Sequence, residues 1–566
     1  MMQYIFKFVT VILSFLILGQ SLGCKQDNPD PEPEPKVIAD FSYAFNTTDL
    51  RIVTFTNKSQ NYKTLAWDFG DSTASSNEIN PVHIYNLEGT YQVTLTATAP
   101  SGDTAMHLDN VTITIPNNEI GKAALWLTKG DKSKLLTREP DLSITETGSG
   151  YPLINIDTAI QYQSMDGFGA ALTGSSAFLI DEILDENERS ALLTSLFDPE
   201  EGIGISYLRL TIGASDFSLS DYTYDDIPAG QTDFDLQQFS MEKDQEDVIP
   251  VLQEIIQISP QIKLMGSPWS PPAWMKTNGS LKGGQLKTNC YSVYADYFVK
   301  YVQEMALEGI TIASITPQNE PLYYTATYPC MQMQPIEQLN FIKNNLGPRF
   351  QEEGLNTKII IYDHNWDNTN YAISILNDPG ASSYIAGSAF HAYAGNVSAM
   401  STVHNAHPEK ELHFTEISGG QWATNFSDNL IWYLRNIFIG TAANWSKSAM
   451  MWNLALDQNH GPQNNGCGDC RGVVTITNPG GVITKNEEYY SIGHFSKFVK
   501  PGAKRIASAL SSGLSNIDLV AFQNPDGDKV MVVCNYGNTA TSFAVRQGIK
   551  YFSYTIPAKS VATIMW

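Results

Sequence analysis

The sequence is short of basic residues: 35 Lys and Arg stand against 59 Asp and Glu among 566 residues, a formal net charge of −24. This deficit argues against a nucleic-acid-binding protein, because a phosphate backbone is bound through an excess of Lys and Arg. It also disfavours electrostatic docking to anionic lipid. Charged residues make up only 17% of the chain, below the usual quarter, whereas 42% are hydrophobic. A wholly disordered chain is therefore excluded.

Cysteine is also scarce, with six residues in the chain. Cys24 follows an N-terminal apolar segment, and an odd number remains beyond it: Cys290, Cys330, Cys467, Cys470 and Cys534. Cys467 and Cys470 form a C-x-x-C without a second pair at zinc spacing, so a structural zinc site is not expected. The pair predicts either a loop disulfide or two free thiols. Cys534 ends the apolar run Val530–Cys534 and is predicted to be a buried core thiol.

The N-terminus predicts export. Lys7 precedes an uncharged run of 16 residues, Phe8–Gly23, which is short for a membrane-spanning helix and typical of a signal-peptide core. The run ends Ser-Leu-Gly-Cys24, which resembles a bacterial lipobox, although Ser stands where Leu is more usual. We therefore expect residues 1–24 to be a lipoprotein-type signal peptide, with Cys24 lipidated in an outer-membrane or cell-surface lipoprotein. Simple secretion, or a periplasmic location, is the alternative.

Residues 25–37 are rich in proline and acidic residues, which predicts an extended tether. Residues 38–116 predict a small all-β unit, because short alternating runs are separated by turns at the spacing of a sandwich. Three motifs in it resemble the hallmark of a PKD domain: WDFGD at 67–71, PVHIY at 81–85 and GTY at 89–91. The resemblance implies an Ig-like β-sandwich with Trp67 in its core and a turn over 68–70. We expect this module to be a spacer; contact with polysaccharide is the alternative.

Strands and helices alternate between residues 164 and 497. The candidate strands are Gly167–Ala171, Ile205–Leu210, Ile262–Gly266, Ile312–Thr316, Lys358–Tyr362, Ala386–Phe390, Leu412–Thr415 and Ala449–Trp452. Helical patterns between them include Glu242–Gln257, Tyr291–Leu307 and Pro335–Leu346. Eight strands alternating with helices predict a (β/α)8 TIM barrel with loop insertions. An open doubly wound sheet is the alternative, but no G-x-G-x-x-G follows a strand to support a dinucleotide fold.

Alternating runs also flank the barrel, at residues 120–163 and 498–566. Within the second segment, Asp526-Gly527 predicts a hairpin turn between two apolar runs. Neither segment is a convincing sheet domain alone. Together they predict one β-sandwich side domain, split in the sequence by the barrel.

In a barrel of this kind, function lies at the C-terminal ends of the strands. Two carboxylates, Glu320 and Glu416, end the fourth and seventh predicted strands. A facing pair is what cleavage of a glycosidic bond requires, because one carboxyl donates a proton and the other faces the anomeric carbon. Surface charge is the alternative in so acidic a protein. However, Glu320 stands between Asn319 and Pro321, and Glu416 follows an apolar strand, which are poor places for a solvated residue.

From about residue 120 onward the chain resembles glycoside hydrolase family 30, especially the branch of lysosomal glucosylceramidase and the microbial β-1,6-glucanases. The motifs follow the family's order: MDGFGAALT from Met165, SDF from Ser215, SPWSPPAWMKTNG from Ser267, PQNEP from Pro317, FTE from Phe414, WNLAL from Trp452 and GHFSKF from Gly493. The family fold, a TIM barrel with a β-sandwich built from both flanking segments, agrees with the split sheet predicted above.

The resemblance implies a retaining reaction, in which Glu416 is the nucleophile and Glu320 the general acid/base. Such roles require a protonated Glu320 beside an ionised Glu416, so their environments should separate the two pKa values. Other residues follow by position: Asn319 on the sugar 2-hydroxyl, Asp216 and Trp269 on other hydroxyls, Trp452 beneath the ring, and Arg209 and Tyr393 holding Glu416 anionic. His391 is either a supporting residue or a satisfied core histidine. Trp274 is interpreted as a wall of the barrel top. No metal and no cofactor are implied.

The loop at residues 457–471 differs from that of the lysosomal lipid-cleaving enzyme and resembles the Cys-containing loop of the microbial relatives. Its polar character favours a glycan, so the prediction is an endo-β-1,6-glucanase that acts on polysaccharide as a monomer. The alternatives are a glucosylceramidase or other exo-acting β-glycosidase, and a non-catalytic glycan-binding surface lipoprotein. The expected partner is a β-glucan or other β-glucoside, with no nucleic acid and membrane contact only through the lipid anchor. Cys290 and Cys330 follow strands three and four on one barrel face, and a disulfide between them is an open possibility.

Overall fold

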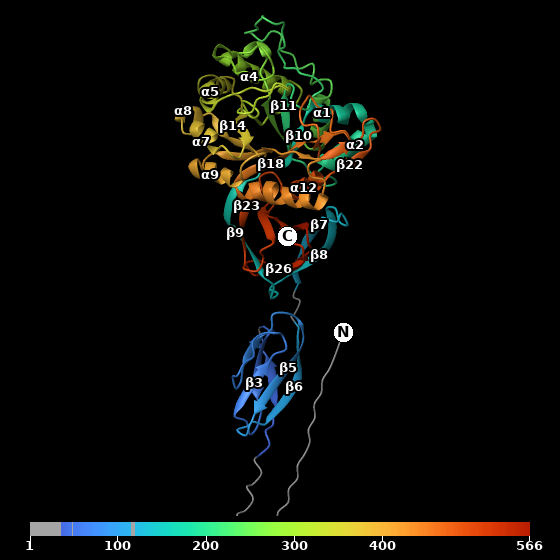
Figure 1. The fold of residues 1–566 in the computed structure, drawn as a ribbon, viewed down its shortest axis with the longest axis vertical. Coiled ribbons are helices and arrows are strands. Elements are labelled where there is room, and N and C mark those ends of the chain that lie inside the picture. The colour runs from blue at the N-terminus through green and yellow to red at the C-terminus, as the bar shows by residue number, and fades with distance from the viewer. Residues whose placement is uncertain (1–34, 48, 115–118) are drawn as a thin grey trace, which may run out of the picture. The chain divides into compact units, whose positions relative to one another are not determined.

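The structure is a computed structural model that describes residues 35–47, 49–114 and 119–566 (Figure 1). The chain divides into two compact units, with the boundary between residues 115 and 116. The predicted export signal, the lipidation site Cys24 and the tether before residue 35 lie outside the described residues. Across the described ranges, none of the helices combines the length and the apolar character that a membrane crossing demands.

The first unit is a sandwich of two three-stranded sheets, with strand orders β1-β2-β4 and β3-β5-β6. Its strands are β1 (Phe41–Phe45), β2 (Ile52–Asn57), β3 (Thr64–Asp68), β4 (Val82–Ile84), β5 (Gly89–Thr98) and β6 (Thr104–Ile113). Trp67 is fully buried in its core and donates its Nε1–H to the carbonyl of Glu78 at 2.9 Å. Gly70 has φ +77°, and its N–H donates to Asp68 at 2.9 Å, which forms the predicted turn. The all-β prediction is confirmed.

The second unit contains a closed barrel of eight parallel strands. They are β10 (Gly167–Leu172), β11 (Tyr207–Ile212), β12 (Lys263–Pro268), β13 (Ser314–Ile315), β14 (Lys358–Asn365), β15 (Ile385–His391), β16 (Glu411–Glu416) and β18 (Ser446–Asn453). The (β/α)8 prediction is confirmed, and the open doubly wound sheet is wrong. All eight predicted strands overlap observed ones. The fourth was predicted too long, because only two of its residues pair in the ladder.

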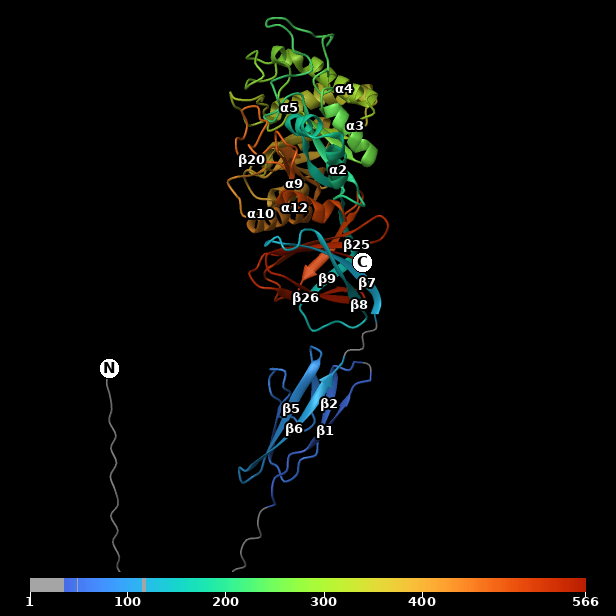
Figure 2. The ribbon, with the colours of Figure 1, turned by 90° about the vertical axis from the view of Figure 1, so that its right-hand side faces the viewer.

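Helices surround this barrel (Figures 1 and 2). They are α1 (Gly174–Phe178), α2 (Glu186–Phe197), α3 (Val248–Ile258), α4 (Tyr291–Leu307), α5 (Pro335–Phe341), α6 (Gly347–Glu352), α7 (Thr369–Leu376), α8 (Pro379–Ser382), α9 (Ser398–Ala406), α10 (Phe426–Trp432), α11 (Ile439–Ala443) and α12 (Glu487–Ser496). Five short helical turns extend or join them: Leu179–Ile183, Ala273–Met275, Thr288–Cys290, Ile342–Leu346 and Tyr433–Phe438. Helix α4 buries Tyr294, Tyr297, Phe298, Tyr301 and Met305, a three-and-four spacing that turns one face to the barrel.

The side domain brings together strands from both flanks of the barrel. Nine strands hydrogen-bond in the closed order β23-β24-β25-β28-β7-β8-β27-β26-β9. They are β7 (Glu119–Lys129), β8 (Thr137–Thr145), β9 (Leu153–Ser164), β23 (Lys504–Leu510), β24 (Ile517–Gln523), β25 (Lys529–Asn535), β26 (Thr541–Gln547), β27 (Lys550–Ile556) and β28 (Ser560–Met565). β7 pairs with β28 and β9 with β23, so the predicted split sheet is confirmed. Cys534 is fully buried in β25, as predicted.

Helix α12 joins the side domain to the barrel. Its buried His494 contacts Thr563 of β28 and Thr128 of β7, each at 2.8 Å. Both partners are neutral hydroxyls, so burial lowers the pKa of His494 to about 3 and the ring is neutral. Five short strands complete the unit within its loops: β17 (Gly419–Gly420), β19 (Ala455–Leu456), β20 (Cys470–Arg471), β21 (Val474–Ile476) and β22 (Ile483–Lys485). β17 and β20 lie in the loops that follow the seventh and eighth barrel strands.

Candidate active site

A cavity of about 350 Å³ opens at the C-terminal ends of the barrel strands. Seven of the predicted site residues line it: Asp216, Trp269, Asn319, Glu320, Tyr393, Glu416 and Trp452. Arg209 and His391 are fully buried behind this lining. Trp274 lies away from the cavity, where its Nε1–H donates to Asp225 at 2.8 Å and its ring packs on Phe234. The seven predicted residues that line the cavity therefore come from six of the eight strand ends.

The two glutamates face each other across the cavity floor. An oxygen of Glu320, an oxygen of Glu416 and a ring nitrogen of His391 all lie within 4.8 Å of one another. In retaining glycosidases the paired carboxyl groups are about 5 to 5.5 Å apart, whereas inverting enzymes need about 6.5 to 9.5 Å to fit a water. The observed spacing fits direct attack by one carboxylate and leaves no room for an interposed water.

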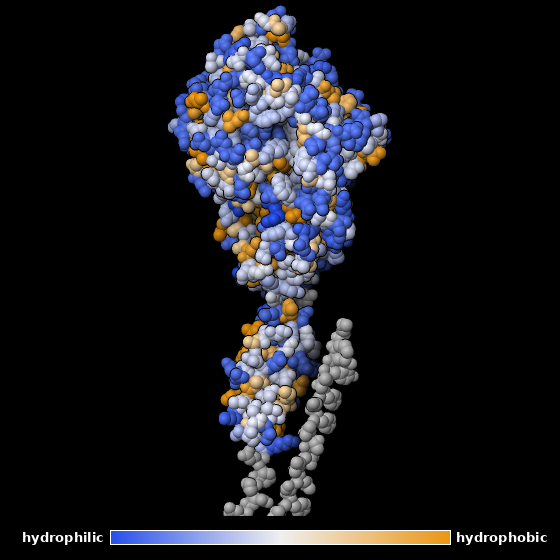
Figure 3. Space-filling model, viewed as in Figure 1, coloured by the Kyte–Doolittle hydropathy of each residue, from blue (hydrophilic) through white to orange (hydrophobic). Residues whose placement is uncertain are grey.

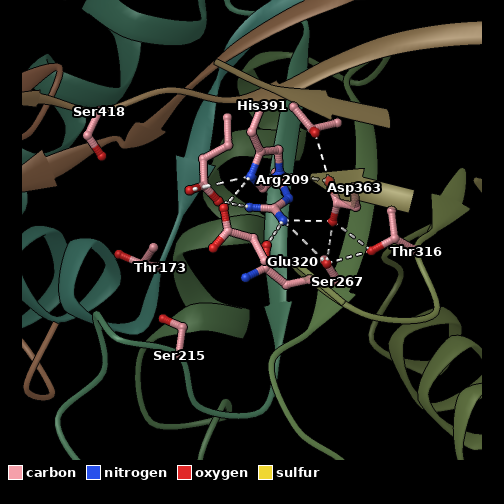
Figure 4. Close-up of polar contacts among 12 residues, drawn as sticks. Thr173, Arg209, Ser215, Ser267, Thr316, Glu320, Asp363, His391 and Ser418 are labelled. Atoms are coloured by element: carbon pink, nitrogen blue, oxygen red, sulfur yellow. Dashed lines mark hydrogen bonds and ion pairs between the residues drawn. The ribbon is translucent and has the colours of Figure 1, made fainter. Parts of the chain in front are cut away.

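Arg209 holds the centre of the site (Figure 4). Its Nη1 donates to Glu416 Oε2 at 2.5 Å, and its Nη2 donates to Asn319 Oδ1 at 2.7 Å and to Asp363 Oδ2 at 2.8 Å. Burial lowers the pKa of Arg209, but Asp363 and Glu416 more than compensate, so the guanidinium stays charged. Tyr393 donates a second hydrogen bond to Glu416, at 2.9 Å to Oε1. Glu416 is thus fixed by two donors, one of them cationic.

Asp363 is a site residue that the sequence analysis missed. This fully buried carboxylate accepts hydrogen bonds from Ser267 at 2.8 Å, Thr316 at 2.8 Å and Thr415 at 2.7 Å, besides Arg209. Burial opposes its ionisation, yet Arg209 and His391 hold its pKa well below the usual range. The sequence does mark this residue, because Asp363 directly follows the predicted fifth strand at its C-terminal end.

Backbone strain accompanies these positions. Tyr362 and Asp363 have φ of +74° and +58°, where the ladder between β14 and β15 shifts register. Glu320 has φ +44°, and its N–H donates to the carbonyl of Asp363 at 3.0 Å. Left-handed conformations of non-glycine residues are costly and cluster at functional sites. The bulge turns Asp363 into the barrel and fixes Glu320 from behind.

His391 bridges three carboxylates. Its Nε2 lies 3.0 Å from Asp363, and its Nδ1 lies 3.1 Å from Glu320 and 3.9 Å from Glu416. Burial opposes protonation, but Glu416, Asp363 and Glu320 together raise the pKa of His391 to about 9. The ring of His391 is buried and fully hydrogen-bonded, and it also contacts Glu320.

The pKa values of the glutamates differ in the opposite sense from the one expected. Burial disfavours ionisation of Glu320, but the hydrogen bond and the charge of His391 outweigh it and lower its pKa. Burial raises the pKa of Glu416, although His391 and Arg209 both oppose the shift. The imidazolium therefore favours an anionic Glu320, the opposite of the protonated state expected from the sequence.

The residues proposed to bind the sugar occupy the cavity walls. Trp269 and Trp452 stack with ring centroids 5.1 Å apart, and the Arg209 guanidinium lies 5.0 Å from the Trp269 ring. Asn319 accepts from Arg209 through Oδ1, which leaves its Nδ2 to donate into the cavity. Burial raises the pKa of Asp216 well above its usual range, with Glu416 and Glu320 adding to the shift. A protonated Asp216 offers both a donor and an acceptor to a hydroxyl.

The rim of the cavity was also missed. It includes Tyr323, Tyr328, Ser418 and Trp422, together with His364 and Asn365 from the end of β14. Tyr323 and Tyr328 stack at 6.3 Å, and Trp422 is 58% exposed. These aromatics lie on loops, where no periodic pattern marks them in the sequence.

The described cysteines include one disulfide and three free thiols. Cys467 and Cys470 form a disulfide, with Cα atoms 5.5 Å apart, and both line the cavity. Cys290 and Cys330 are free thiols, so a disulfide between them is wrong. The Cys330 sulfur instead accepts the N–H of Gly283 and of Thr325, each at 3.2 Å.

Comparison with known families decides the class of the protein. Residues 165–499 match the glycosyl hydrolase family 30 TIM-barrel domain, and residues 502–564 match the family 30 β-sandwich domain. The chain belongs to glycosyl hydrolase family 30. Residues 32–115 match a PKD domain. This family 30 hydrolase thus has the fold and the two accessory modules that its motifs predicted.

Its relatives act on more than one kind of glucoside. An endo-1,6-β-D-glucanase of Neurospora crassa is 35% identical over 421 residues, 70% of this chain and 82% of its own length. The mouse lysosomal acid glucosylceramidase is 30% identical over 451 residues, 75% of this chain and 85% of the relative. The solved structure of an endo-β1,6-glucanase has 38% identity and a TM-score of 0.74, covering 79% of this chain and 99% of that one.

Proposed function

We propose that this family 30 hydrolase is a retaining endo-β-1,6-glucanase. The observation that carries the mechanism is the spacing of Glu320 and Glu416, whose oxygens lie within 4.8 Å on the cavity floor. The substrate is proposed from the relatives, because endo-1,6-β-glucanases are 33–35% identical to this chain and glucosylceramidases 28–30%.

In the proposed first step, Glu416 attacks the anomeric carbon while Glu320 protonates the leaving oxygen. The C–O bond to the leaving sugar breaks, and an ester forms between the glucosyl carbon and Glu416. In the second step, Glu320 takes a proton from water, the water oxygen attacks the anomeric carbon, and Glu416 leaves as a carboxylate. Arg209 and Tyr393 support this step because their hydrogen bonds stabilise the departing anion.

The first step requires a proton on Glu320, whose pKa His391 lowers. A bound sugar excludes water and strengthens the repulsion between the two carboxylates, which favours a proton on one of them. Glu416 keeps donors from Arg209 and Tyr393, whereas Glu320 accepts only from His391 at 3.1 Å. The proton therefore settles on Glu320 once substrate is bound. His391, whose Nδ1 lies 3.1 Å from Glu320, is the nearest group that can supply it once bound substrate raises the pKa of Glu320.

The side chains that line the cavity walls are proposed to bind the substrate. Asn319 donates to the 2-hydroxyl, Asp216 and Trp269 bind other hydroxyls, and Trp452 packs beneath the ring. The surface drawn in Figure 3 is mostly hydrophilic over the barrel, with apolar residues in small scattered groups. A hydrophilic surface over the barrel suits a water-soluble glucan better than a ceramide.

We also propose the cellular setting. A signal peptide over residues 1–24 and lipidation of Cys24 would tether the enzyme to the cell surface, with the PKD domain as a spacer and the monomer as the working form. Metabolic labelling with a fatty acid checks the anchor. Label that persists in a Cys24→Ala variant would contradict it.

Hydrolysis of a linear β-1,6-glucan, compared with β-1,3-glucan and glucosylceramide in micelles, tests the activity. We expect rapid loss of viscosity and release of mixed oligosaccharides from the β-1,6-glucan alone. Glu320→Ala is the matched control: it should lose polysaccharide cleavage but keep activity on an aryl glucoside with a good leaving group, with azide restoring turnover. Cleavage of glucosylceramide and not of β-1,6-glucan would overturn the specificity.

A further inference from the structure

A Cys467–Cys470 disulfide lines the same cavity as the catalytic glutamates, and the reaction proposed above does not use it. The disulfide closes a four-residue turn in the loop after the eighth barrel strand. Cys470 belongs to one buried cluster with Trp269, Trp452 and Phe217, and the partly buried Cys467 packs against it. The disulfide therefore lies against the wall that receives the sugar.

This turn is joined to the loop that follows Glu416. Gly420 of β17 pairs with Cys470 of β20, and the N–H of Gln421 donates to the carbonyl of Asp469 at 2.9 Å. Asp469 lies inside the disulfide turn. The loops after strands seven and eight are thus held in register at the cavity rim.

Trp422 rests on this junction. A Cβ added to Gly420 would lie 2.1 Å from the Trp422 ring and 2.5 Å from the carbonyl of Asp469. Only glycine lets the indole and the disulfide turn approach the backbone so closely. Trp422 is 58% exposed and lines the cavity. Its indole is therefore accessible beside the catalytic glutamates.

Both ends of the loop are anchored. On one side, the Asn464 N–H donates to the carbonyl of Asp216 at 2.7 Å. On the other, Arg471 follows Cys470 directly and binds the buried Glu488 at 2.6 Å and Glu487 at 2.8 Å. The part between them carries the disulfide turn.

We propose that the Cys467–Cys470 disulfide is a specificity-determining clamp, which fixes Trp422 as a stacking platform for a glucose unit beyond the one at Glu320 and Glu416. The inference rests on the proposed glucanase function and adds the element that selects a chain over a single glucoside. Aromatic faces bind the apolar faces of sugar rings, and a fixed ring loses less entropy on binding. Reduction of the disulfide frees the turn beneath Trp422 and weakens binding of the chain.

The test compares a β-1,6-linked hexasaccharide with β-glucosyl fluoride, whose leaving group is a single atom. Trp422→Ala should lower kcat/KM for the hexasaccharide about tenfold, mainly through KM, and Cys467→Ser/Cys470→Ser about threefold or more. For β-glucosyl fluoride both variants should lose clearly less than they lose on the hexasaccharide, because this substrate places no sugar beyond the one at the glutamates. Trp432→Ala is the matched control, because Trp432 is 42% exposed on α10 and does not line the cavity.

A double-mutant cycle shows whether the disulfide acts through Trp422. Adding the two serines to Trp422→Ala should cost little more on the hexasaccharide, because the platform is already gone. A thiol reductant should lower hexasaccharide cleavage by the parent and leave the Ser/Ser variant unchanged. Equal losses on both substrates, or parental hexasaccharide kinetics in the variants, would overturn the clamp. Failure of the parent enzyme to cleave either substrate would instead overturn the proposed function.

Discussion

Strand β16 carries a histidine–carboxylate cluster at each of its ends, and the two clusters have opposite characters. At its start, Glu411 lies 3.6 Å from His413 and is bound by Lys447 at 2.6 Å and Lys358 at 2.8 Å. At its end, Glu416 shares a site with Glu320, Asp363 and His391, and among the described residues Arg209 is the one lysine or arginine bound to the group. The same residue types thus build both ends of one barrel.

The difference lies in the balance of charge, because a cavity opens beside each of the two clusters. At the strand starts, Lys263 and Lys447 bind Asp166 at 2.7 and 3.5 Å, so lysines match the carboxylates. Burial opposes ionisation of Glu411, but His413 and the lysines hold its pKa well below the usual range. At the strand ends, carboxylates outnumber cations. A satisfied ion network stabilises a barrel, whereas an under-compensated one beside a cavity is poised for chemistry.

Substitution of one glutamate at each end of β16 should give the largest difference between the two clusters. Glu416→Gln should lower kcat by at least about a thousandfold, because no nucleophile remains. Glu411→Gln, its matched control, should keep activity within about threefold and lose about 1–2 kcal/mol of stability, because only a partly exposed ion network is weakened. Initial rates on β-1,6-glucan and urea unfolding measure the two effects. Activity in the first variant would refute the nucleophile assignment.

The next largest effect is expected when the buried Asp363 is neutralised, with Asp166 as the control. Asp363→Asn should lower kcat about a hundredfold and cost about 3 kcal/mol of stability, because Arg209 and His391 lose a buried counter-charge. The Asp363 charge raises the pKa of His391, so the variant's alkaline limb of kcat should move to lower pH. Asp166→Asn, at the strand starts, should leave that pH profile where it is. An unmoved profile in Asp363→Asn would show that this carboxylate has only a packing role.

A smaller effect is expected in the pH dependence of stability. Buried Asp244 accepts from Tyr222 and Tyr224, each at 2.6 Å, and burial raises its pKa to about 6. Its folded pKa lies above the unfolded value, so its contribution is full below about pH 4 and is lost as pH rises through 6. Glu411, with a lowered pKa, contributes above about pH 4.5 and loses that contribution as pH falls.

These two groups therefore place the maximum of stability at about pH 4 to 4.5, with a fall as pH rises towards 6, as thermal unfolding from pH 3 to 8 would show. Asp244→Asn should flatten the alkaline limb and Glu411→Gln the acid limb. Stability that climbs steadily from pH 5 to 8 would contradict the assignment of Asp244.

The smallest effect is expected for Lys447→Met. The side chain is mostly buried and binds Glu411 and Asp166, but Lys358 and Lys263 remain to neutralise them. We expect a loss of about 1 kcal/mol and activity within about twofold of the parent. A tenfold loss of activity would show that the strand starts are coupled to the site, and the separation of roles drawn here would fail.

Much of the barrel was predictable because its strands are apolar runs long enough to stand out between helices. Glu320 and Glu416 were found because they follow such runs. Asp363 follows an apolar run as well, so the same rule applied to the fifth strand identifies it. The long connection after β11 gave no such signal, and its helix α3 begins at Val248 and not at Glu242 as predicted.

Proximity between loops was not predictable. Cys290 and Cys330 stand on one barrel face, yet they are not bonded, because spacing along strands says nothing of distance across a face. The pKa order of the two glutamates also escaped prediction. It depends on which carboxylate oxygen His391 contacts, a matter of ångströms that a motif does not encode.

The central claim is that the two glutamates are close enough for a double displacement. Proton NMR of β-1,6-glucan cleavage, recorded before the products mutarotate, tests it most directly. The β anomer of the reducing sugar should appear first, and the α anomer should appear only later, by mutarotation. An α anomer formed first would mean that a water stands between the carboxylates, and it would contradict the role given to Glu416.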